Sequence, residues 1–193
     1  MAVLMTGWFA FWRRRASWPI AAAAIAAQFA FSMVFLNGGD SAWEKAVAGG
    51  GGKVPEMLPG LPAVEPARSM EALRANGAVD DYLLWQAIDV PFALLNVLAI
   101  TAAMALFLRK AGVDRGLLHA MLFLPIIYFA AELVENGMVA AFALEAFPPN
   151  GAPALVQQVA TTTKLASGTG GMALGLLSLI GAVILDVARL FRR

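Results

Sequence analysis

Four long apolar stretches, separated by polar segments, dominate the pattern of the chain. They run over about residues 18–36, 82–108, 117–147 and 154–191. Crossing about 30 Å of hydrocarbon takes roughly 20 helical residues, so each stretch is long enough to span a bilayer. We therefore predict an all-α, polytopic membrane protein. It should form a single transmembrane domain over residues 1–193, built as a bundle of four transmembrane helices.

The composition supports this class and excludes several others. Hydrophobic residues make up 60% of the chain and charged residues only 14%, against about 25% charged residues in ordinary soluble domains. The chain has no cysteine and one histidine, His119, which excludes disulfides, thiol catalysis and cysteine metal sites. The net charge of +1 offers no basic field for nucleic acid. We expect no cofactor and no nucleic-acid partner.

The first apolar stretch could also be read as a cleaved signal peptide, because Arg13, Arg14 and Arg15 precede it. Its apolar run is longer than the 7–15 residues typical of a signal sequence, so we interpret it as an uncleaved span. The aromatic residues of segment 1–12 suit a segment that lies in the headgroup layer. A frayed apolar terminus is the alternative for this segment.

The distribution of Lys and Arg predicts the topology. Basic residues cluster at positions 13–15, at positions 109, 110 and 115, and at positions 189, 192 and 193, whereas the connection 145–153 has none. The positive-inside rule then places both termini in the cytoplasm and the loop 37–81 outside. We expect a multi-pass protein of the bacterial cytoplasmic (inner) membrane, with membrane lipid as a partner.

The loop 37–81 is predicted to contain a short amphipathic helix over residues 67–75. Met70 and Leu73 form its apolar pair, and Asn76-Gly77 is a typical helix stop. A glycine- and proline-rich linker precedes this helix. The helix is expected either to lie on the membrane surface or to cap the bundle.

Polar side chains lie inside three of the spans. The second span has an aspartate and an asparagine, the third has two glutamates and an asparagine on one helical face, and the fourth has a threonine run followed by a lysine. At about 1.5 Å of rise per residue, these groups fall in one band between the outer surface and the midplane. The candidate ligand-binding residues are Asp89, Asn96, Glu132, Glu135, Asn136, Thr161 and Lys164.

The cost of placing ions in lipid predicts that these groups face one another. Four ionisable residues facing lipid would cost on the order of 10 kcal/mol. We expect Lys164 to pair with Glu135 or Asp89. At least one remaining acid should hold a proton or meet a cation, and Glu132 is the deepest. Because Lys164 shares the band, we expect no metal site.

Three motifs resemble a widespread set of small bacterial four-span membrane proteins. They are Asp89-Val-Pro91-Phe92 after Tyr82, Glu132-Leu-Val-Glu135-Asn136, and Thr161-Thr-Thr-Lys164. The resemblance covers about residues 58–193. The usual first acid of the second motif is Asp, here Glu132, and the order Pro91-Phe92 is reversed, but no functional group is lost. The resemblance supports the cluster and implies no particular reaction.

Three functions fit the cluster. In the first, it binds a small polar or lipid-like ligand from the outer leaflet, and any chemistry would use a protonated Glu132 or Glu135 as acid and Asp89 as base. In the second, it couples transport to protons or ions in an oligomer, for which small residues of span four offer a homodimer contact. In the third, it is a latch between helices in a structural or accessory subunit. The expected contact residues of that homodimer are Ser167, Gly171 and Gly175.

Overall fold

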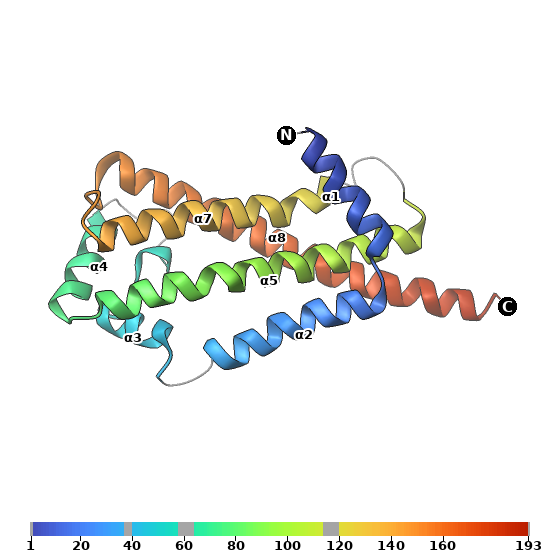
Figure 1. Ribbon diagram of the computed structural model, residues 1–193, viewed down its shortest axis with the longest axis horizontal. Coiled ribbons are helices and arrows are strands. Elements are labelled where there is room, and N and C mark those ends of the chain that lie inside the picture. Colours follow the sequence, from blue (N-terminus) through green and yellow to red (C-terminus); the bar gives the residue numbers. More distant parts are fainter. Residues whose placement is uncertain (1, 37–39, 58–63, 114–119, 193) are drawn as a thin grey trace. The chain divides into compact units, whose positions relative to one another are not determined.

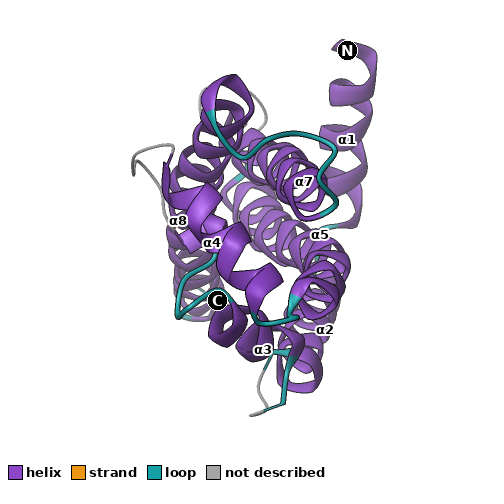
Figure 2. Cartoon of the chain, turned by 90° about the vertical axis from the view of Figure 1, so that its left-hand side faces the viewer, coloured by secondary structure: helices purple, strands orange, loops and turns teal. Residues whose placement is uncertain are grey.

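The computed structural model describes residues 2–36, 40–57, 64–113 and 120–192 of the chain (Figure 1). Figure 2 shows helices and loops throughout this described part, without a strand. The predicted all-α fold is confirmed. The helices are α1 (Ala2–Arg15), α2 (Trp18–Phe35), α3 (Ala42–Gly49), α4 (Val64–Ala75), α5 (Val79–Ala111), α7 (Leu124–Ala143) and α8 (Gly151–Leu190), with 3₁₀ turns η1 (Pro55–Met57) and η2 (Met121–Phe123).

Four helical segments are long and apolar enough to cross a membrane, and they coincide with the predicted spans. They are Trp18–Phe35, Val79–Ala111, Met121–Ala143 and Gly151–Leu190. The third ends at Ala143 rather than at 147. Glu145 adopts a φ of 59° just beyond that end, a left-handed conformation that cannot continue a right-handed helix. His119 and Arg115 lie outside the described residues.

Exposed apolar side chains and buried carboxylates distinguish this chain from a soluble protein. Large apolar side chains of α8 lie on the surface, with Leu177 62% exposed and Ile184 60% exposed. Carboxylates are inside, with Glu132 1% exposed and Glu135 fully buried. An exposed apolar surface of this kind needs lipid around it. Together with the four apolar helices, it indicates a multi-pass membrane protein.

The chain divides into two compact units, and helices α2, α5, α7 and α8 contribute to both. Unit 1 comprises Met1–Gln28, Leu95–Tyr128 and Ala166–Arg193. Unit 2 comprises Phe29–Leu94 and Phe129–Leu165. The single transmembrane domain expected over residues 1–193 stays a prediction.

The core of unit 1 joins α1, the start of α2, and the second half of α5. Trp12 of α1 is 4% exposed and packs with Ala21 of α2 and Met104 of α5. Residues 2–12, expected either in the headgroup layer or as a frayed terminus, belong to the helix α1, which packs through Trp12. Their place in the headgroup layer stays a prediction. In the same unit, Gly171 and Gly175 of α8 lie against Ile100 of α5. The predicted homodimer contact at these glycines stays a prediction, and α5 of the same chain already covers them.

Unit 2 contains the predicted amphipathic helix, which is α4. Met70 and Leu73 are both buried, as expected from their spacing. The helix starts at Val64, earlier than the predicted residue 67, and it stops where predicted. Gly77 has a φ of 64°, and the amide of Ala78 donates to the carbonyl of Leu73 at 2.9 Å, a typical C-terminal cap.

Helix α3 was not predicted, although its N-cap has a recognisable sequence. The side chain of Ser41 accepts a hydrogen bond from the amide of Glu44 at 3.3 Å. Ser-x-x-Glu is the pattern of a capping box. A helix of eight residues is too short to show a clear hydrophobic period, so only the cap could have indicated it.

Hydrogen bonds fasten α3 and α4 to each other and to the end of α7. The side-chain amide of Asn76 donates to the carbonyl of Gly49 at 2.7 Å. Arg74 donates to the carbonyl of Phe142 at 2.7 Å and pairs with Glu145 at 3.0 Å. Phe142 itself is fully buried in the core of unit 2. Within unit 2, α3 and α4 thus form a layer packed on α5 and α7.

Candidate functional site

The centre of the candidate site is Lys164 on the buried side of α8. Its ammonium group lies 3.1 Å from Oε1 of Glu132 and forms a second ion pair with Glu135. The two glutamates are three residues apart on α7, so both face α8. The pair with Glu135 confirms one of the two expected alternatives, and the contact with Glu132 was not expected.

Asp89 of α5 joins the same cluster through α7. The side-chain amide of Asn136 donates to Oδ2 of Asp89 at 3.5 Å. Asp89 and Glu132 thus lie near enough for their carboxyl groups to interact. Two carboxylates close together in a low dielectric repel each other unless one of them holds a proton or a cation balances them. The proton expected on Glu132 stays a prediction.

A second line of hydrogen bonds runs along α8 from Glu135. The hydroxyl of Thr161 donates to Oε1 of Glu135. The side-chain amide of Gln157, one turn earlier, donates to Oγ1 of Thr161 at 2.8 Å and to the carbonyl of Pro55 at 3.3 Å. Gln157 and Thr161 are fully buried. The cluster therefore extends from α7 through α8 to the turn η1.

The turn η1 adds a fourth carboxyl group, that of Glu56. The hydroxyl of Tyr82 donates to its Oε2 at 2.7 Å, and Nε2 of Gln86 donates to its Oε1 at 2.9 Å. Burial raises the pKa of Glu56 to about 7, although the hydrogen bond from Tyr82 acts in the opposite direction. Glu135 raises this pKa further by its negative charge, while Lys164 lowers it.

Replacing Glu56 by Gln should remove a pH dependence of stability. Because burial raises the pKa of Glu56 from 4.5 to about 7, the folded protein keeps a proton that the unfolded chain releases. Its contribution to stability is thus fully present below pH 4.5 and is lost as the pH rises to about 7. Melting temperatures across this interval should fall more steeply for the wild type than for the Glu56→Gln variant. Equal slopes would contradict the assignment.

The structure brings six of the seven predicted site residues together in unit 2. They are Asp89, Glu132, Glu135, Asn136, Thr161 and Lys164. Asn96, the seventh, belongs to unit 1, where it is 5% exposed and its Nδ2 has no hydrogen-bond partner. The expectation that Asn96 belongs to the site stays a prediction.

Glu56, Gln86 and Gln157 were missed as site residues. Tyr82, Gln86 and Asp89 follow one another at helical spacing, so they share one face of α5. That spacing could have indicated Gln86. Gln157 lies one turn before Thr161 and could have been found in the same way. Glu56 lies in a loop without periodicity, where no local signal distinguishes it from the other acids of segment 37–81.

The site has more acceptors and negative charge than donors and positive charge. The cluster contains four carboxyl groups, those of Glu56, Asp89, Glu132 and Glu135, and one amine, which contacts the last two of them. Buried oxygens of two side chains, Oε1 of Gln86 and Oε1 of Gln157, have no hydrogen-bond partner among the described residues. Buried acceptors are nearly always paired in proteins. The arrangement can therefore take up protons or a group that brings hydrogen-bond donors.

Comparisons with protein-family models, with curated proteins and with solved structures find no match for the chain. The resemblance of its three motifs to small bacterial four-span proteins stays a prediction.

Proposed function

We propose that the cluster in unit 2 binds a small polar or lipid-like ligand that brings hydrogen-bond donors. The observation that supports this proposal most is the surplus of acids and unpaired acceptors in the cluster, which has Lys164 as its one amine. An amine or a polyhydroxylated headgroup would supply the missing donors, and a cationic one would also reduce the repulsion among the carboxylates. Lys164 keeps two of the acids paired when the site is empty.

We further propose that the protein lies in the bacterial cytoplasmic membrane with both termini in the cytoplasm. The positions of Lys and Arg along the chain support this orientation. Segment 37–81 then faces outward, and the turn η1 lies where a ligand from the outer leaflet would enter. The partial exposure of Glu56 and its hydrogen bonds to Tyr82 and Gln86 support η1 as the entrance.

Acid–base chemistry on the bound ligand would use the carboxyl pair of Glu132 and Asp89. Two carboxyl groups close together in a low-dielectric site favour one protonated and one ionised member. The protonated group would donate to a leaving or developing anionic atom, and the ionised group would accept a proton from the ligand. Glu135 would stay bound to Lys164 and to Thr161 and would hold the lysine in place.

Mass spectrometry of the purified protein tests ligand binding. Glu132→Gln keeps the shape of the side chain and removes its charge and titration. The wild type, released from micelles, should carry a small-molecule adduct that this variant loses while its melting temperature stays within a few degrees. Glu71→Gln, which changes an exposed acid of α4, is the matched control and should keep the adduct. An adduct of equal abundance in all three proteins would contradict the proposal.

Proton-coupled transport is a second candidate, because the hydrogen-bonded groups form a continuous series. It runs from Gln157 through Thr161 and Glu135 to Lys164 and Glu132. Proton flux into liposomes that falls in both Glu132→Gln and Glu135→Gln would favour this function. Flux that survives both substitutions would exclude a relay through these groups. With neither flux nor adduct, a latch between helices would be left.

A further inference from the structure

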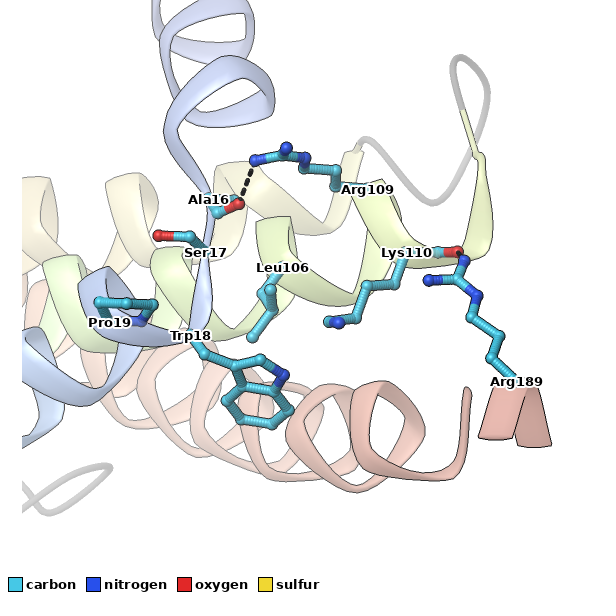
Figure 3. Close-up of a pocket in the computed structure, with 8 residues that line it drawn as sticks. All are labelled: Ala16, Ser17, Trp18, Pro19, Leu106, Arg109, Lys110 and Arg189. Atoms are coloured by element: carbon cyan, nitrogen blue, oxygen red, sulfur yellow. Dashed lines mark hydrogen bonds between the residues drawn. The ribbon is translucent and has the colours of Figure 1, made fainter. Parts of the chain in front are cut away.

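A second polar site lies in unit 1, at the end where α2 begins and α5 and α8 finish. A pocket of about 350 Å³ opens there, lined by residues 16–19, Leu106, Arg109, Lys110 and Arg189. Figure 3 shows the basic side chains of α5 and α8 gathered beside the first residues of α2. These basic residues predict the topology, and none of them belongs to the site in unit 2.

Positive charge exceeds negative charge around this pocket. Asp186 accepts two hydrogen bonds from the ammonium of Lys110, at 2.5 and 2.7 Å, and lies 3.9 Å from Arg189. Arg109 donates to the carbonyl of Ala16 at 2.6 Å and meets no carboxylate in the described part of the chain. The pocket thus has three cations beside one carboxylate, which only Lys110 and Arg189 contact, and the guanidinium of Arg109 keeps donors for a further acceptor.

The start of α2 adds to the positive potential. The first amides of a helix point outward without intrahelical partners, and the helix dipole favours an anion there. Trp18, at this start, donates its indole N–H to Asp186 at 2.8 Å, and its ring lies 5.7 Å from the ammonium of Lys110. The ring therefore helps to hold Asp186 and Lys110 together and leaves the guanidinium groups at the mouth of the pocket.

We propose that this pocket binds the phosphate group of an anionic membrane phospholipid. Phosphate accepts several hydrogen bonds, and a guanidinium group matches its geometry. A lipid is favoured over a soluble phosphate because α2 begins and α5 and α8 end near this pocket, as apolar helices do at the headgroup layer, and because Trp is typical of that layer. Leu106 and Pro19 supply an apolar wall for the start of the acyl chains.

Native mass spectrometry of the full chain, titrated with dioleoyl phosphatidylglycerol or dioleoyl phosphatidylcholine, tests the proposal. Phosphatidylglycerol should bind the wild type more tightly than phosphatidylcholine does. Arg109→Gln should weaken the binding of phosphatidylglycerol about fivefold, the change in affinity expected when one cation near an anionic headgroup is removed. Gln keeps a donor for the carbonyl of Ala16, and Arg109→Lys should restore most of the affinity. Arg192→Gln removes an exposed charge that does not line the pocket and should change little.

A second variant, Arg189→Gln, covers the case in which Arg109→Gln fails to fold. Unchanged phosphatidylglycerol binding in the folded variants, or an equal loss in Arg192→Gln, would overturn the proposal. Titration with inorganic phosphate alone distinguishes a phospholipid headgroup from a free phosphate as the ligand. Binding of inorganic phosphate without preference for the anionic lipid would assign the pocket to a soluble phosphate and overturn the lipid assignment.

Discussion

Replacing Lys164 by Met should lower the free energy of unfolding by about 3–5 kcal/mol, the usual loss when one partner of a buried ion pair is removed. Glu132 and Glu135, both buried, would be left without their shared cation. The carboxyls would then have to take up protons to avoid an uncompensated charge. Unfolding of the purified protein in mixed micelles, at increasing fractions of a denaturing detergent, measures this loss.

Lys45→Met is the matched control, because it removes the same group from an exposed position of α3. Surface substitutions of this kind usually change stability by less than about 0.5 kcal/mol. If Lys164→Met were as stable as Lys45→Met, Lys164 would not balance a buried charge. This result would contradict both the proposed ligand site and the latch between helices, because both assume that Lys164 is paired with buried acids.

Phe142→Ala should destabilise the protein by about 3–5 kcal/mol, the typical cost of truncating a fully buried phenylalanine. Its ring lies in the core of unit 2, among residues of α3, α4, α5 and α7. The cavity left by the change would loosen the layer that α3, η1 and α4 form on the ends of α5 and α7. Melting temperature in detergent is the measurement.

Phe147→Ala provides the control for this substitution, since the side chain of Phe147 is 51% exposed and the same atoms are removed. It should shift the melting temperature far less than Phe142→Ala. Equal shifts in the two variants would contradict the packing of segment 37–81 onto the membrane helices. They would also remove the support for η1 as part of the site.

The spans and the cluster could be predicted because lipid imposes strict conditions on a sequence. A long apolar stretch has few alternatives to a membrane helix, and an ionisable residue inside one must find a partner. Depth along each helix was enough to bring Glu135 and Lys164 together. It did not predict the contact between Lys164 and Glu132, because Glu132 lies about one turn deeper along the third span than Glu135, whereas the long side chain of Lys164 reaches both.

Segment 37–81 was harder to predict because its structure depends on contacts distant in the sequence. Met70 and Leu73 had a helical period, so α4 was found. Glu56 becomes part of the site only because Tyr82 and Gln86 reach it from α5. The same holds for the basic pocket of unit 1, whose cations are near one another only after α5 and α8 have folded.

The measurement that tests the account most directly is a double-mutant cycle between Lys164 and Glu135. The free energy of unfolding is measured for the wild type, Lys164→Met, Glu135→Gln and the double variant. If the amine of α8 and the acid of α7 meet inside the protein, the double variant should be more stable than the sum of the single losses predicts, by at least about 1 kcal/mol. Losses that add within about 0.5 kcal/mol would show that the two groups act independently, and the buried cluster would not exist as described.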